Sequence, residues 1–267
     1  DDHISNTPRQ IQIFAALGWK SPKYGHIPMI LGADKTRLSK RHGATSVIDY
    51  KKTGYLSDAM VNYLARLGWG HGNQEIFSRP ELVEKFSIKK VVKTPAVFDM
   101  DKLTWMNGMY IRKLPPDDYY ALVKPLLMEA YPAAVNLPDD QLKKIAICLQ
   151  DRIRLLPEIV AFTSFFFKDP EYNADDVEKY LKTNTAKSLL PELAARLGSL
   201  EKFEKAEIET VFRKLADERG LKAADLIHPA RVALTGSSQS PPLFDVVELL
   251  GKDVTLQRLS LKKFGYN

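Results

Sequence analysis

Residues 26–32 read His-Ile-Pro-Met-Ile-Leu-Gly, a short apolar run that ends in glycine. A continuous run of this kind is typical of a strand that is covered on both faces in a parallel sheet. Such a strand needs neighbours, because its buried N–H and C=O groups must be paired. The rest of the chain offers no second convincing strand, and residue 1 is an aspartate. We therefore expect the neighbouring strands in a sheet domain upstream of residue 1; an all-helical protein with one stray edge strand is the alternative.

The remainder of the sequence has the periodicity of amphipathic helices. Thr7 and Pro8 suit the start of a helix that runs to about residue 18, Ser57 can cap another, and Ser78 with Glu81 has the spacing of a capping box. Further helices are expected over 99–108, 116–130, 138–155, 157–167, 174–182, 186–198, 204–219, 221–234 and 242–250. Proline-containing joints at 114–116 and 137–138 indicate a boundary between two helical domains within 113–138. The predicted fold class is mainly α, with one α/β unit at its start.

Composition narrows the class of protein. The 267 residues, 45% of them hydrophobic, suit about two domains. No run approaches the ~18 apolar residues of a membrane helix and no secretory signal opens the chain, so we expect a soluble, intracellular protein without a membrane partner. Cys148 is the single cysteine and the five histidines are scattered, which predicts no internal disulfide and no structural metal. The net charge of +6 fits either simple solubility or a polyanionic partner.

Directly after the predicted strand comes the run Arg-Leu-Ser-Lys-Arg-His-Gly at residues 37–43. In open α/β sheets ligands collect at the carboxyl ends of the strands, so this cationic loop is placed for a nucleotide. When a carboxylate attacks the α-phosphorus of ATP, charge accumulates on the departing pyrophosphate, and a positioned cation stabilises that transition state. Lys40 is our candidate for this cation; Ser39 can donate a hydrogen bond to a phosphate, and Arg37 and Arg41 add charge. Taken alone, the run would be read as a solvated basic loop.

The loop resembles the KMSKS-type loop of class I aminoacyl-tRNA synthetases. With its flanks, the chain resembles the bacterial type of glutamyl-tRNA synthetase, as a C-terminal portion that lacks the N-terminal catalytic half. The resemblance implies that residues 1–45 end a Rossmann-like catalytic domain, that 46–125 form a helical region contacting the tRNA stem, and that 126–267 form a helical anticodon-binding domain. It also implies that Asp2 and Ile30 lie against ATP, which Mg²⁺ accompanies. One departure is Arg37, where the family commonly has lysine.

Residues 228–236 and 240–244 are similar to segments of the family's anticodon-binding domain. Ser240 and Pro241 align with a segment that packs against an anticodon base, although a Ser-Pro-Pro run is also an ordinary helix start. Helical arithmetic over 141–156 places Arg152 on the same apolar face as Ile145 and Leu149. Two interpretations of Arg152 stay open. It is a buried ion pair or snorkelling stem, or it is a guanidinium that reads the third anticodon base, as the resemblance implies.

The resemblance thus implies a glutamate–tRNA ligase, a cytoplasmic monomer that uses ATP to join glutamate to tRNA(Glu). We expect the chain to bind tRNA without aminoacylating it by itself, because it holds neither the family's histidine-containing ATP motif nor the glutamate pocket. One alternative is a non-catalytic helical RNA-binding module whose loop only grips phosphates. A second is a protein-interaction scaffold with no RNA role.

Overall fold

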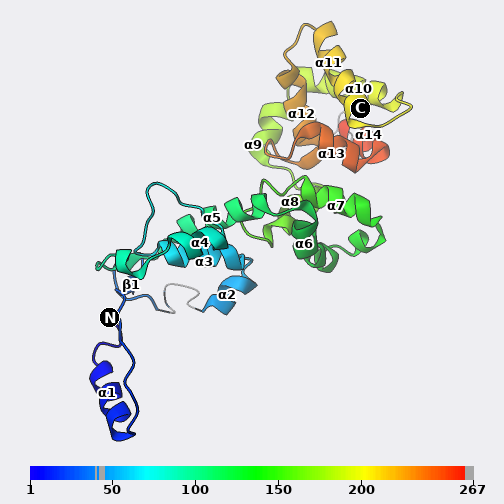
Figure 1. Ribbon diagram of the computed structural model, residues 1–267. Helices are drawn as coiled ribbons and strands as arrows, with labels where there is room; N and C mark the ends of the chain where they lie inside the picture. The colour runs from blue at the N-terminus through cyan, green and yellow to red at the C-terminus, as the bar shows by residue number, and fades with distance from the viewer. Residues whose placement is uncertain (40, 42–45, 262–267) are drawn as a thin grey trace. The chain divides into compact units, whose positions relative to one another are not determined.

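The computed structural model of the protein describes residues 1–39, 41 and 46–261. The chain divides into two compact units, with the division between Lys113 and Leu114. Helices dominate both units, which confirms the prediction of a mainly α chain (Figure 1). No helix among the described residues is both long enough and apolar enough to cross a membrane. The three-part division at residues 45 and 125 stays a prediction.

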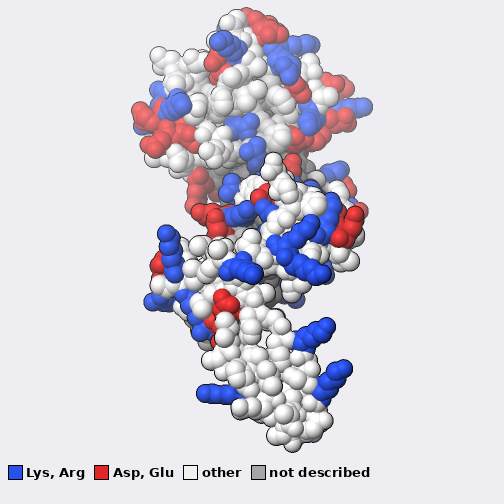
Figure 2. Space-filling view, turned by 60° about the vertical axis from the view of Figure 1, so that its left-hand side comes forward, with Lys and Arg blue, Asp and Glu red and all other residues white. Residues whose placement is uncertain are grey.

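The first unit contains one small sheet and five α-helices among its described residues. Its elements, in chain order, are α1 (Thr7–Ala16), β1 (Ile30–Leu31), α2 (Val47–Lys52), α3 (Ser57–Arg66), α4 (Arg79–Lys85), the 3₁₀ turn η2 (Ile88–Lys90), β2 (Ala96–Val97) and α5 (Met100–Lys113). Helix α1 contributes no buried residue. Figure 2 shows that the surface of the α1 region is mostly uncharged, and exposed Ile11, Ile13 and Leu17 lie on it.

The sheet corrects two expectations from the sequence. Strand β1 is confined to Ile30–Leu31, so the strand predicted over 26–32 is too long. Pro28 has no N–H to give to a ladder, and the partner strand has only two residues. That partner is β2, which pairs in parallel with the register Ile30↔Ala96 and Leu31↔Val97. The chain therefore does contain a second strand, and it lies downstream of β1.

Buried asparagines anchor α3 to the segment before α4 and to α5. The Asn62 side chain donates to the carbonyl of Glu75 at 2.9 Å and accepts from the Phe77 N–H at 2.6 Å. Asn107 on α5 accepts from the Leu56 N–H at 2.8 Å, at the residue that precedes α3. Both asparagines are fully buried, so these bonds replace water that the side chains lose on folding. Asn107 thus ties the start of α3 to α5.

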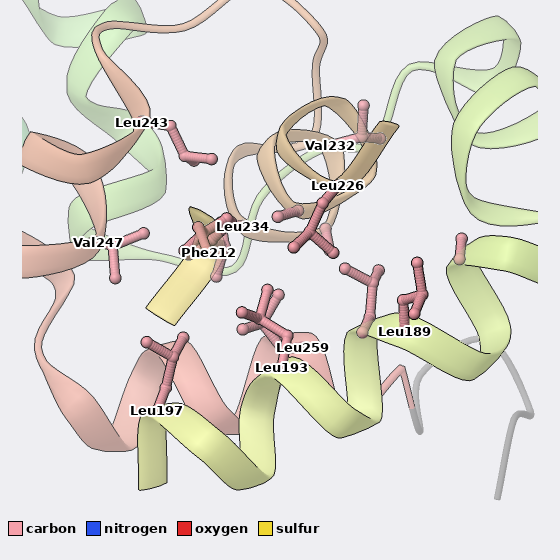
Figure 3. Close-up of a cluster of buried hydrophobic side chains, with 14 of the residues drawn as sticks. Leu189, Leu193, Leu197, Phe212, Leu226, Val232, Leu234, Leu243, Val247 and Leu259 are labelled. Atoms are coloured by element: carbon pink, nitrogen blue, oxygen red, sulfur yellow. The ribbon is translucent and has the colours of Figure 1, made fainter. Parts of the chain in front are cut away.

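The second unit is helical throughout its described residues. Its elements are α6 (Pro116–Ala130), the 3₁₀ turn η3 (Pro132–Asn136), α7 (Asp139–Ile147), α8 (Glu158–Phe167), α9 (Ala174–Asp176), the π-helical turn η4 (Val177–Leu181), α10 (Asn184–Gly198), α11 (Lys205–Glu218), α12 (Ala223–Thr235), α13 (Leu243–Leu250) and α14 (Lys252–Leu259). Side chains from α10 to α14 converge on one apolar core (Figure 3). Leu193, Phe212 and Leu259 lie within it.

Local signals predicted some helix ends and missed others. The capping box of Ser78 and Glu81 is present at the start of α4. Ser57, in contrast, is the first residue of α3 rather than its cap, a position that Leu56 holds. The helix predicted over 138–155 is wrong beyond Ile147, where the chain changes to turns.

Candidate functional site

The segment after β1 reverses the chain in a tight turn. The Gly32 N–H donates to the Thr36 carbonyl at 2.8 Å, and Lys35 adopts a left-handed conformation with φ of 60°. Leu31 then bridges to Arg37 in antiparallel fashion, and the Leu38 N–H donates to the Ile30 carbonyl at 3.0 Å. The basic loop therefore starts alongside β1, at the carboxyl end of the strand, where the sequence placed it.

Three of the predicted nucleotide residues lie together around one hollow. Arg37 Nη2 lies 2.9 Å from Asp2 Oδ2, and both side chains line a cavity of about 570 Å³ together with Ile30. The ion pair is largely exposed, so it contributes little to stability and can be exchanged for another anion. Asp2, Ile30 and Arg37 therefore border the same open space.

The rest of the basic loop is arranged differently. The Arg41 guanidinium does not line this hollow and instead pairs with Asp34, with 3.3 Å between Nη2 and Oδ2. Ser39 is half-buried and follows Leu38, which does line the hollow. Lys40, our candidate for the catalytic cation, lies outside the described residues.

The predicted anticodon segment is fixed by an arginine that the sequence did not single out as a site residue. Arg231 on α12 donates from Nη1 to the Ser240 carbonyl at 3.0 Å, to Ser240 Oγ at 2.6 Å and to the Pro241 carbonyl at 2.6 Å. Ser240 and Pro241 are both buried. The partners of Arg231 are mostly backbone carbonyls, which leave no trace in a sequence pattern.

Arg152 lies beside this arrangement but not where helical arithmetic put it. Because α7 ends at Ile147, Arg152 sits in the following turns and is exposed, which excludes the buried ion pair. Arg152 lines a hollow of about 660 Å³ with Pro242 and Asp245. Burial, and to a lesser degree the charge of Arg152, lowers the pKa of Arg231. The positive charges of Arg152 and Arg231 are therefore close enough to interact near the start of α13.

Cys148 lines the same hollow, and its chemistry gives a prediction. Burial, followed by the charge of Asp245, raises the pKa of the Cys148 thiol to about 12. Since only the thiolate is nucleophilic, iodoacetamide at pH 8.5 should alkylate the folded chain about a hundredfold or more slowly than the urea-unfolded chain. The folded rate should still be rising with pH above 10. A rate that levels off near pH 9 would contradict this environment.

Two family models match the chain, one in each of its two parts. Over residues 118–262 the chain matches the family described as "Anticodon binding domain". Over residues 1–105 it matches the family described as "tRNA synthetases class I (E and Q), catalytic domain". No group of three or more His, Cys, Asp or Glu side chains that could hold a metal ion occurs among residues 1–39, 41 and 46–261.

Individual relatives give the same result. The glutamate–tRNA ligase of Thermodesulfovibrio yellowstonii is 44% identical over 97% of this chain and 56% of the relative, and that of Geobacter sulfurreducens is 46% identical over 97% of this chain and 55% of the relative. A crystal structure of a glutamate tRNA ligase from Elizabethkingia meningosepticum in complex with its amino acid has a TM-score of 0.84 at 26% identity. It matches 100% of this chain and 56% of that one. The chain thus spans little more than half the length of these relatives.

The helical fold, the cationic loop after β1 and the two family matches define a class I aminoacyl-tRNA synthetase. Within that class, the chain belongs to the glutamate–tRNA ligase family. The family expected from the loop and its flanks is confirmed, and the share of the relatives that is covered agrees with the expectation of a portion of the enzyme.

Proposed function

We propose that this chain acts within a glutamate–tRNA ligase, which activates glutamate with ATP and transfers it to tRNA(Glu). The observation that carries the proposal is the convergence of Asp2, Ile30 and Arg37 on one hollow at the start of the basic loop. The first arginine of the loop and an acidic residue 35 positions upstream, both assigned to ATP by the resemblance, thus face the same open space. The proposal also includes a cytoplasmic location and a monomeric state, both of which we expect from the sequence.

The chemistry follows from charge. An oxygen of the glutamate carboxylate forms a bond to the α-phosphorus of ATP, the bond from that phosphorus to the bridging oxygen breaks, and pyrophosphate leaves. The attacking group is already an anion, so positioning and electrostatic stabilisation suffice and no base is needed. Lys40 is assigned to the charge that develops on pyrophosphate, with Arg37, Arg41 and the Ser39 hydroxyl supporting it. The terminal ribose hydroxyl of tRNA then attacks the carbonyl carbon, and AMP leaves.

The proposal also includes Mg²⁺, which would bind together with ATP. Because no three acidic or histidine side chains converge in the described part of the chain, the triphosphate and water would supply most of its ligands. The residues of the loop would then bind a metal–nucleotide complex rather than hold the metal themselves.

The second unit is proposed to read the anticodon. The exposed Arg152 guanidinium has planar donors that match the edge of a base, and it borders a hollow large enough for one. Ser240 and Pro241 are buried and do not line this hollow themselves; held by Arg231, they fix the start of α13, where Pro242 and Asp245 border it. A fixed helix start beside Arg152 suits specific recognition, because less of the site must be ordered on binding.

The change Arg152→Gln tests this role. It removes a base-reading guanidinium from an exposed position, so the dissociation constant for a tRNA(Glu) transcript should rise about tenfold while the chain stays folded. Arg213→Gln on α11 removes the same charge from an exposed side chain paired with Glu209, and should change the dissociation constant less than about twofold. Filter binding or fluorescence anisotropy measures both. Equal losses in the two variants would mean that Arg152 contributes only charge.

A further inference from the structure

Asp34 organises the turn that leads into the basic loop. Its Oδ1 accepts hydrogen bonds from the Thr36 N–H at 3.0 Å and from the Thr36 hydroxyl at 2.7 Å. An aspartate that accepts from the backbone two residues on is the usual stabiliser of such a turn. With Lys35 left-handed and Gly32 bonded to Thr36, these contacts fix the direction in which the chain leaves β1.

The other carboxylate oxygen of Asp34 has a separate partner. Oδ2 accepts from Arg41 Nη2 at 3.3 Å, and the same nitrogen donates to Thr36 Oγ1 at 2.5 Å. The side chains of Asp34 and Arg41 are 48% and 65% exposed, so water and dissolved anions can reach the pair. At the other end of the loop, Arg37 is paired with Asp2. Both guanidiniums in the described part of the loop are therefore bound to carboxylates that lie outside it.

We propose that Asp34 is a positioning residue for the nucleotide loop, an internal counter-anion that holds Arg41 against the turn until a polyphosphate takes its place. The inference rests on the proposed function of the loop. An exposed carboxylate–guanidinium pair is weak, and a polyphosphate carries several negative charges, so displacement by the ligand is favourable. Until then Arg41 is neutralised and held against the turn, and ligands with a single negative charge compete poorly for it.

Asp34→Asn separates the two roles of this side chain. The amide oxygen can still accept from Thr36, so the turn is retained, while the charge that competes for Arg41 is lost. The 267-residue chain carrying this change should bind inorganic tripolyphosphate about three- to fivefold more tightly than the unchanged chain at low salt, measured by calorimetry. The difference should shrink at high salt, because exposed charges are screened. A merely structural role would weaken binding instead.

Two controls make the result specific to the pair. Asp101→Asn on α5 removes the same charge from an exposed position in the same unit, and it should leave affinity within about twofold of the unchanged chain. In an Arg41→Ala background, Asp34→Asn should change the affinity much less, since the guanidinium that it neutralises is gone. If Asp101→Asn gives the same gain, or if the Asp34→Asn gain persists without Arg41, the proposal is overturned.

The remaining outcomes separate this inference from the function on which it rests. Binding by the unchanged chain that is lost in Arg37→Ala, but is not tightened by Asp34→Asn, would overturn the role of Asp34 and leave the loop as a phosphate site. Failure of both the unchanged chain and the Asp34→Asn chain to bind tripolyphosphate would overturn the phosphate-binding role of the loop as well.

Discussion

Replacing Lys40 with alanine should lower the rate of glutamate-dependent ATP–pyrophosphate exchange about a hundredfold to a thousandfold in a full-length glutamate–tRNA ligase that contains this chain. The loss is large because the ammonium is assigned to charge that grows only as pyrophosphate departs, so its removal raises the barrier rather than weakening the bound ground state. Affinity for tRNA should change less than about threefold, because tRNA contacts are spread over many phosphates.

The same experiment distinguishes a ligase from a module that only grips RNA. Lys51→Ala on α2 removes an equal charge from an exposed helix end nearby in the sequence, and should leave exchange within about twofold. A Lys40→Ala enzyme that loses tRNA affinity but keeps its exchange rate would favour the non-catalytic RNA-binding module.

Gly236→Ala should destabilise the second unit by about 3–5 kcal/mol. Gly236 ends α12 in a left-handed conformation with φ of 83°, and its carbonyl accepts from the Asn173 N–H at 2.8 Å. A Cβ added there would lie 2.9 Å from the carbonyl carbon of Glu171 and would overlap its oxygen. Both partners are backbone, so neither can swing aside, and the joint between α12 and the segment before α9 must shift. Urea unfolding followed by circular dichroism measures the loss.

Gly220→Ala is the matched control. Gly220 has a similar positive φ of 61°, but nothing lies within 4 Å of an added Cβ. The change should therefore cost only the left-handed penalty of about 1–2 kcal/mol. Similar losses for the two glycines would show that backbone conformation alone, and not the contact with Glu171, explains the cost at Gly236.

Local signals in the sequence predicted those parts of the fold that depend only on residues close together in the chain. The capping box of α4 is one example, because both partners lie three residues apart and need nothing from the rest of the chain. Strand β2 could not be predicted in the same way. It has two residues, and its pairing with β1 joins positions 66 apart in the sequence, Ile30 with Ala96. No periodicity can show in a strand of that length.

The candidate sites show the same difference between features that a short stretch of sequence reveals and features that only the structure reveals. The type and order of residues in 37–43 predicted a phosphate-binding loop and the family, and the structure brings Asp2, Ile30 and Arg37 to one hollow. Arg231 and Asp34 were not identified from sequence, because their partners are backbone groups, hydroxyls and one guanidinium, and no periodic pattern marks these contacts. For Arg152 the predicted helix was wrong, since α7 ends five residues earlier.

Binding of the 267-residue chain to an unmodified tRNA(Glu) transcript, compared with the same transcript carrying a swapped anticodon, tests the proposed reading of tRNA most directly. Both are measured at two salt concentrations. We expect the tRNA(Glu) transcript to bind about tenfold or more tightly than the swapped one, and both to weaken as salt rises, because base contacts give specificity and phosphate contacts give salt dependence. Equally weak binding of the two transcripts would contradict the account, because the second unit would then have no anticodon site.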